Sequence, residues 1–281
     1  FSMLLGGVTL AVGYDIVRRV YPQEPGLALG TAAFMAFLPM HLAMNAGVNN
    51  DALSDLMLAL VVWRLLTMDG PRWRWRDTLG LGGLLGLALL TKMQAYVAVG
   101  MALFALGWDM ATVNRSGRAW GWRDALVRAG AMLGVALVVV SPWLARNMLL
   151  YGPSDPLGMV RHDQVAAGQL TTQQFLAQYG AARWARDLVV TTFQSFWGQF
   201  GWMGVPLPER VYAALGILSA LVGAGLAVYL WHLRSRTIEF DGEGVGQDAS
   251  ATSSRPLAAG DDARTRSGWR SYLGTRAYGT F

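Results

Sequence analysis

Residues 79–108 read LGLGGLLGLALLTKMQAYVAVGMALFALGW, a run of 30 residues in which Lys92 is the only charged side chain. A single helix of this length would be about 45 Å long, whereas the hydrocarbon core of a bilayer is about 30 Å thick. Arginine-rich segments flank the run on both sides, so the chain must cross the membrane an even number of times between them. We therefore predict two short helices that meet near Thr91-Lys92-Met93, with Lys92 at the outer surface or in a shallow water-filled pocket.

The composition of the chain is that of a membrane protein. Its 281 residues are 53% hydrophobic and 15% charged, and the mean hydropathy is +0.32. Soluble domains carry about 25% charged residues, so the missing charge points to lipid as the solvent. The net charge of +5 comes from arginines scattered between apolar runs, and no continuous basic stripe predicts a nucleic-acid partner. The absence of cysteine excludes disulfides and thiol catalysis, and three histidines leave little for a His-rich metal site.

Seven apolar runs predict an all-α protein, a polytopic integral membrane helical bundle with about seven membrane segments. The runs cover about residues 1–17, 27–44, 52–68, 79–91, 93–110, 129–145 and 211–232. Arginines lie at successive cytoplasmic ends of these runs: Arg18, Arg19, Arg72, Arg74, Arg76, Arg115, Arg118, Arg123, Arg128, Arg234 and Arg236. We therefore expect a multi-pass protein of the cell inner (plasma) membrane, with the segments 41–51, 92 and 146–209 on the extracytoplasmic side.

Two regions follow from the composition. Residues 1–234 form the membrane region, and residues 235–281 form a flexible cytoplasmic linker or tail rich in Gly, Ser, Ala, Asp and Arg. Within the large extracytoplasmic loop at about 146–209, Thr171 and Gln174 fit a capping box that precedes apolar residues at helical spacing. We expect this helix to lie along the membrane surface.

Polar residues gather between the second and third apolar runs. They are His41, Asn45, Asn49, Asn50 and Asp51. Near an outer membrane face these groups could bind a phosphate-linked sugar or, through Asp51, a divalent metal ion held by oxygen ligands. The alternative is that Asn50 or Asp51 only caps the helix that starts at Ala52.

Two cations stand out at the predicted outer boundary. Lys92 is the one lysine of the chain and suits a lipid phosphate as a point charge, or it only marks a helix end where its side chain reaches toward water. Arg146, which is followed by Asn147, lies on the predicted extracytoplasmic side, where basic residues are less common. This position favours a pyrophosphate or phosphate ester as the partner of its guanidinium. Alternatively, Arg146 pairs with Asp155 or Asp163.

An aromatic stretch precedes the last apolar run. Residues 195–202 read SFWGQFGW, and such side chains either stack on sugar faces or anchor the chain at the membrane interface. The sequence has no G-x-x-x-x-G-K-[ST] loop, Rossmann fingerprint, H-E-x-x-H or G-x-S-x-G motif. Nucleotide hydrolysis and serine-hydrolase chemistry therefore have no support.

Four of these motifs together resemble one family. They are Asn49-Asn50-Asp51, the GLALLTK run that ends at Lys92, the PWxxRNxxxYG pattern at 142–152 and the SFWGxFGW pattern at 195–202. Their order and sidedness are similar to bacterial membrane proteins of the GT-C superfamily, and most of all to members akin to the protein O-mannosyltransferases and aminoarabinose transferases. The resemblance covers roughly residues 1–232.

The resemblance implies a glycosyltransferase of the cell envelope that moves a hexosyl or pentosyl group. Such an enzyme takes the sugar from a polyprenyl-phosphate donor in the lipid bilayer and transfers it at the extracytoplasmic face. In that family the catalytic carboxylate lies in the first extracytoplasmic loop, so we expect it upstream of Phe1 in a longer chain.

The same resemblance implies roles for residues of this chain. It implies Asp51 as a helper acid or as the ligand of a divalent metal ion, and Lys92 and Arg146 as contacts of the lipid phosphate. Together with their polar neighbours, the candidates for binding substrate or lipid phosphate are Asn49, Asn50, Asp51, Lys92, Arg146 and Asn147. The alternative class is a multi-span transporter or a non-catalytic membrane scaffold. A transporter is expected to place ionisable residues or broken helices near the bilayer midplane, whereas the charges here gather at the boundaries.

Overall fold

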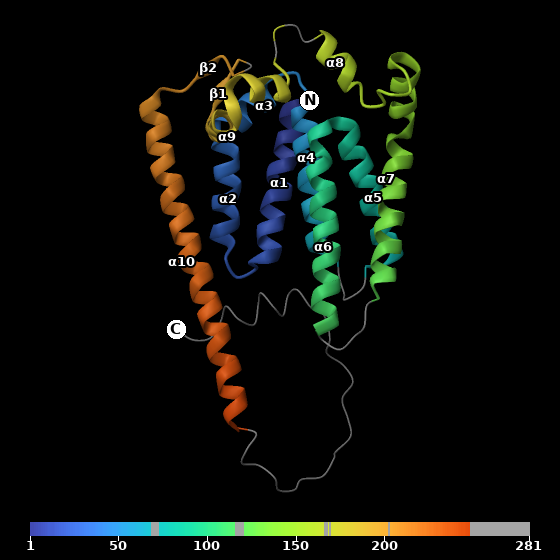
Figure 1. Ribbon diagram of the computed structural model, residues 1–281. Helices are drawn as coiled ribbons and strands as arrows, with labels where there is room; N and C mark the ends of the chain where they lie inside the picture. The colour runs from blue at the N-terminus through green and yellow to red at the C-terminus, as the bar shows by residue number, and fades with distance from the viewer. Residues whose placement is uncertain (69–72, 116–120, 166–167, 169, 202, 248–281) are drawn as a thin grey trace. The chain divides into compact units, whose positions relative to one another are not determined.

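The computed structural model describes residues 1–68, 73–115, 121–165, 168, 170–201 and 203–247, and almost all of them are helical (Figure 1). The prediction of an all-α protein is therefore confirmed. The elements are α1 (Ser2–Val20), α2 (Pro25–Phe37), α3 (Pro39–Ala46), α4 (Asp51–Thr67), α5 (Trp75–Thr91), η1 (Met93–Ala95), α6 (Tyr96–Arg115), α7 (Trp122–Tyr151), α8 (Met159–Val165), α9 (Thr172–Trp197), β1 (Gln199–Phe200), β2 (Val205–Pro206) and α10 (Glu209–Gln247). The chain divides into two compact units, and the second begins at Thr191, inside α9.

The first unit contains a bundle of helices that run alternately in opposite directions (Figure 1). Helices α1, α4 and α6 run one way, and α2, α5 and α7 run the other way. The start of α1, the start of α4 and the end of α5 therefore lie at one end, which we call the Lys92 end because Lys92 directly follows α5. The opposite end, where α1 ends and α5 and α7 begin, carries Arg18, Arg74 and Arg123, and we call it the arginine end. Of the predicted boundary arginines, Arg72 and Arg118 lie outside the described residues.

Helices α5 and α6 confirm the prediction of two short helices within residues 79–108. Helix α5 ends at Thr91, Lys92 is extended with φ −159° and ψ 137°, and α6 begins at Tyr96 after the single turn of η1. The break lies where the sequence predicts it, at Thr91-Lys92-Met93.

The run at 27–44 is not one straight helix. Pro39 disfavours a helical conformation at the residue before it, and Leu38 accordingly has φ −65° and ψ 117°. Pro39 then starts α3 as its first helical residue, where its missing N–H costs nothing. The two helices are bent by 59° at this point.

Two described helices are long and apolar enough to cross a membrane, within Trp122–Tyr151 and Glu209–His232, and the bent pair α2–α3 makes a third if it counts as one span. Helices α4 and α5 have 17 residues each, which corresponds to about 25 Å against about 30 Å of hydrocarbon. The structure therefore does not confirm seven segments, and that number stays a prediction.

Three boundaries differ from the sequence prediction. Helix α7 continues without interruption through Arg146 to Tyr151, so the segment predicted as a loop at 146–209 begins with helix and also holds α8 and most of α9. Helix α10 continues to Gln247, so the first part of the predicted tail at 235–281 is helical, and residues 248–281 lie outside the described part. The capping box is confirmed, because the Thr171 N–H donates to Gln174 Oε1 (2.9 Å) and the Gln174 N–H donates to Thr171 Oγ1 (3.3 Å).

Helices α5 and α7 are parallel and approach each other closely. A Cβ atom at Gly82 would lie 2.5 Å from the carbonyl oxygen of Met132, and one at Gly86 would lie 2.6 Å from Cβ of Val139. Small residues four positions apart let helix backbones come this close in a membrane. Because Gly82 meets Met132 and Gly86 meets Val139, the contact also fixes the register of the two helices. The sequence analysis did not identify this G-x-x-x-G pair.

A hydrogen bond and an ion pair join neighbouring helices toward the arginine end. Asp15 of α1 accepts hydrogen bonds from Arg19 of α1 and from the indole N–H of Trp63 on α4 (2.6 Å). Arg64 of α4 pairs with Asp77 of α5. Arg19 and Arg64 therefore both have acidic partners within the bundle.

We predict that Gly86→Ala destabilises the protein whereas Gly83→Ala does not. The added methyl group at position 86 meets the fixed Cβ of Val139, and such overpacking costs about 1–3 kcal/mol. A Cβ at Gly83 meets nothing within 4 Å, so it provides a control with the same change of helix propensity. Thermal unfolding of the two purified variants in one detergent measures the difference, and equal unfolding temperatures would show that the α5–α7 contact is looser than described.

Candidate functional site

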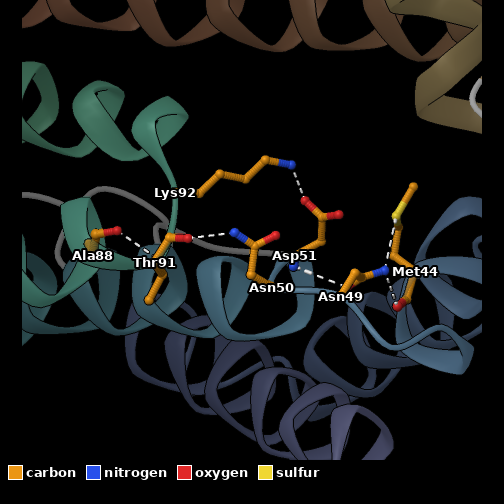
Figure 2. Close-up of polar contacts among 7 residues, drawn as sticks. All are labelled: Met44, Asn49, Asn50, Asp51, Ala88, Thr91 and Lys92. Carbon is orange, nitrogen blue, oxygen red and sulfur yellow. Dashed lines mark hydrogen bonds and ion pairs between the residues drawn. The ribbon is translucent and has the colours of Figure 1, made fainter. Parts of the chain in front are cut away.

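An ion pair joins the start of α4 to the end of α5 at the Lys92 end (Figure 2). Nζ of Lys92 contacts Oδ1 of Asp51, and the two side chains are 32% and 25% exposed. Asp51 is the first residue of α4, where the helix N-terminus favours a negative charge. Lys92 reaches it from the extended residue that follows α5. Two residues that the sequence analysis treated separately, 41 positions apart, thus form one group.

Hydrogen bonds between asparagine side chains and backbone groups reinforce the same junction. Nδ2 of Asn50 donates to the carbonyl oxygen of Thr91 (2.6 Å), which directly ties the residue before α4 to the last residue of α5 (Figure 2). Oδ1 of Asn49 accepts the N–H of Asp51 (3.0 Å), and Nδ2 of Asn49 donates to the carbonyl oxygen of Met44 (3.1 Å). The three adjacent residues therefore contact two other segments: Asn49 contacts Met44 of α3, and Asn50 and Asp51 contact Thr91 and Lys92 at the end of α5.

The capping alternative for Asn50 and Asp51 is wrong in its simple form. Asn50 does occupy the N-cap position of α4, but its side chain makes no capping hydrogen bond and instead reaches Thr91. The carboxylate of Asp51 is engaged by Lys92. Both side chains therefore make long-range contacts in place of the local capping hydrogen bond that the sequence pattern favours.

A second carboxylate lies next to the pair, and the sequence analysis missed it. Asp55 follows Asp51 by one helical turn, is partly buried and interacts electrostatically with His41, Asp51 and Lys92. The signal was present, because Asp51 and Asp55 are four residues apart at the start of an otherwise apolar run, and ionisable residues in such runs are rarely without a function.

Asn45 has a different environment from the one predicted. Nδ2 of Asn45 donates to the carbonyl oxygen of His41 (2.8 Å), and its side chain is buried against Gly6 of α1. A Cβ at Gly6 would lie 2.3 Å from Oδ1 of Asn45. Asn45 thus packs α3 on α1, and we do not place it in the binding group.

Arg146 and Asn147 lie near the end of α7, apart from the pair. Asn147 is buried; its Nδ2 donates to the carbonyl oxygen of Pro156 (3.1 Å), and its Oδ1 accepts from Nη1 of Arg146 (3.3 Å). Asp155 does not pair with Arg146, because its carboxylate accepts the backbone N–H of Arg161 (2.8 Å). Within the described ranges Arg146 has no acidic partner, so the proposed pair with Asp155 or Asp163 is not found.

The register of α5 and α7 places Arg146 relative to Lys92. Met132, Val139 and Arg146 follow one another at intervals of seven residues along α7, so Arg146 lies about two turns beyond the contact of Val139 with Gly86. From the contact at Gly86, five more residues complete α5 and seven more lead to Arg146, a difference of about 3 Å along the axis. Arg146 therefore lies at nearly the same level along the helix axes as Lys92, which follows the end of α5.

The aromatic stretch belongs to the second unit, where it contacts residues close to it in the chain. The rings of Phe196 and Trp197 pack edge to face with centroids 5.2 Å apart. The hydroxyl of Tyr212 donates to the carbonyl oxygen of Gly198 (2.7 Å) and accepts the N–H of Leu207 (2.9 Å), which closes the turn of β1 and β2. Sugar binding by this stretch stays a prediction, and Trp202 lies outside the described residues.

The metal role of Asp51 gains no partner ligands from the structure. Over the positions that the structure describes, no three His, Cys, Asp or Glu side chains are grouped so that they could hold a metal ion. The ammonium of Lys92 occupies the place beside Oδ1 of Asp51. Metal binding by Asp51 therefore stays a prediction.

A membrane glycosyltransferase is the class that the helices and the family comparison define. The sequence profile of the family described as dolichyl-phosphate-mannose-protein mannosyltransferase matches residues 1–145, which is more than half of the chain. The chain belongs to this family. The match covers α1 to α6 and most of α7, including Asp51 and Lys92. No curated protein and no solved structure matches the chain.

We predict that Asp51 and Lys92 are energetically coupled. The variants Asp51→Asn and Lys92→Gln each break the same contact, so the double variant should be more stable than the sum of the two single effects predicts, by about 1 kcal/mol. Unfolding of all four proteins in mixed micelles by titration with dodecyl sulfate gives the coupling free energy. Additive effects would show that the ion pair contributes nothing to the junction of α4 and α5.

Proposed function

We propose that this protein transfers a sugar from a polyprenyl-phosphate carrier to an acceptor hydroxyl at the extracytoplasmic face of the inner membrane. The Lys92–Asp51 group supports this proposal most directly, because it holds an ammonium, a suitable partner for a phosphate, at the end of the bundle. We assign the extracytoplasmic face to the Lys92 end. Arginines gather at the opposite end, as the bias of basic residues toward the cytoplasm requires.

The proposed reaction is a substitution at the anomeric carbon of the donor sugar. The acceptor oxygen forms a bond to this carbon, the bond from the carbon to the phosphate oxygen breaks, and its electron pair leaves with the lipid phosphate. A carboxylate base takes the proton of the acceptor hydroxyl. Negative charge thus develops on the lipid phosphate, and fixed cations beside it lower the barrier.

We assign the two cations of this site to Lys92 and Arg146. Lys92 directly follows α5 and Arg146 lies on α7, and the register of these parallel helices at Gly82 and Gly86 places both residues at nearly the same level along the helix axes. Lys92 supplies a compact charge, and the guanidinium of Arg146 supplies two parallel donors. Asn147 orients Arg146, and Asp51 orients Lys92.

Arg146 matters because of the charge balance. The acidic groups Asp51 and Asp55 lie beside Lys92 and His41, and a phosphate would add further negative charge. Arg146, with no acidic partner in the ranges that the structure describes, supplies the charge that makes such binding favourable.

We predict that Lys92→Gln and Arg146→Gln each lower the turnover number for glycosyl transfer by about 10²-fold, the effect of removing one donor from a developing anion. Arg146→Lys should also lower it, because an ammonium does not reproduce the paired donors of the guanidinium. The full-length protein in proteoliposomes, supplied with radiolabelled polyprenyl-phosphate hexoses and pentoses, gives the rates.

The control is Arg183→Gln on α9, which removes an exposed arginine paired with Asp187. This variant should retain the rate of the unmodified protein. Normal rates in both Gln variants at positions 92 and 146 would reject the assignment of these cations. Absence of transfer from every polyprenyl-phosphate sugar would reject the proposed function itself.

A further inference from the structure

Lys92 has a counterion already, and this fact bears on how a lipid phosphate could reach it. The ammonium contacts Oδ1 of Asp51, so a phosphate that binds Lys92 competes with an internal carboxylate. We propose that the donor phosphate displaces Asp51 from Lys92, so that Asp51 is the positioning residue that holds the ammonium until the lipid arrives. This inference rests on the proposed function and adds to it an internal competitor for the phosphate.

The junction does not depend on the ion pair for its connection. The hydrogen bond from Nδ2 of Asn50 to the carbonyl oxygen of Thr91 joins the same two helices and involves neither charged side chain (Figure 2). Lys92 can therefore leave Asp51 while the start of α4 and the end of α5 stay together. Both side chains of the pair are also partly exposed, so an exchange of partners needs no opening of the core.

The local backbone favours the exchange on both sides. Lys92 has an extended backbone conformation between α5 and η1. Its four-carbon side chain allows the ammonium to move without a change in α5. Asp51 lies in the first turn of α4 and accepts stabilisation from the helix N-terminus after the ammonium has left. A carboxylate with this second source of stabilisation gives up its cation at a lower cost.

The exchange has a consequence for the site. Once the ammonium has moved to the phosphate, the carboxylate of Asp51 becomes available to hydrogen-bond a hydroxyl group of the sugar or the acceptor. Asp55 lies one turn further along α4 and provides a second carboxylate beside it. Donor binding and the exposure of Asp51 are thereby coupled.

The inference predicts an increase in affinity when Asp51 loses its charge. In Asp51→Asn, Lys92 has lost its charged competitor, and farnesyl phosphate should bind about two- to tenfold more tightly than to the unmodified protein. If Asp51 only tied two helices together, the substitution would leave the affinity unchanged or weaken it. Asp51→Ser serves as a second variant in case Asp51→Asn does not fold.

Calorimetric titration of the full-length protein in detergent measures these affinities. Asp77→Asn is the matched control, because Asp77 also pairs with a cation between α4 and α5 but toward the arginine end, and its affinity should stay unchanged. Farnesol tests whether the phosphate is needed, and inorganic phosphate tests whether the lipid is needed. The combined variant Asp51→Asn/Lys92→Gln should lose the gain.

The outcomes separate the two proposals. Tighter binding in a folded Asp51 variant supports the exchange, and equal or weaker binding in both folded Asp51 variants overturns it while leaving the proposed function intact. Failure of the unmodified protein to bind farnesyl phosphate overturns both. A gain that persists in the combined variant shows that Lys92 is not the group that Asp51 holds, and it overturns the exchange.

Discussion

The close contact of α5 and α7 at Gly82 and Gly86 is the constraint on which the rest of the first unit depends. No Cβ atom fits at either position, so the two parallel helices have one register. That register brings the end of α5 to the same level as Arg146, which lies 14 residues after Met132 on α7. The positions of Lys92 and Arg146 at one end of the bundle follow from a packing contact about two turns away.

The two ends of the first unit differ in how their charges are used. At the arginine end, Arg19 pairs with Asp15 within α1, and Arg64 of α4 pairs with Asp77 of α5 and so links two helices. At the Lys92 end, one ion pair is partly exposed and Arg146 is exposed, with Asn147 as its hydrogen-bond partner. A structural role accounts for the first set. At the Lys92 end, Arg146 has a positive charge without an acidic partner among the described residues, and Lys92 is accessible. Both cations can bind an anionic lipid headgroup, and this is the basis of the proposed glycosyl transfer.

Length and helical pattern predicted much of this structure. A run of 30 residues exceeds one membrane span, and the break at Lys92 followed from that limit together with the arginine-rich segments on both sides. The capping box at Thr171 was equally local. By contrast, the pairing of Asp51 with Lys92 joins residues 41 positions apart and depends on how α4 meets α5, which no local pattern encodes. The same holds for Asn50, whose local preference is a cap but whose tertiary partner is Thr91.

We propose that the lipid phosphate of a sugar donor binds at the Lys92 end. The decisive test is an electron cryomicroscopy structure of the full-length protein in a lipid nanodisc with polyprenyl phosphate bound. We expect phosphate density within hydrogen-bonding distance of Nζ of Lys92 and of the guanidinium of Arg146. Phosphate density at the arginine end, or at a place that neither side chain reaches, would contradict it.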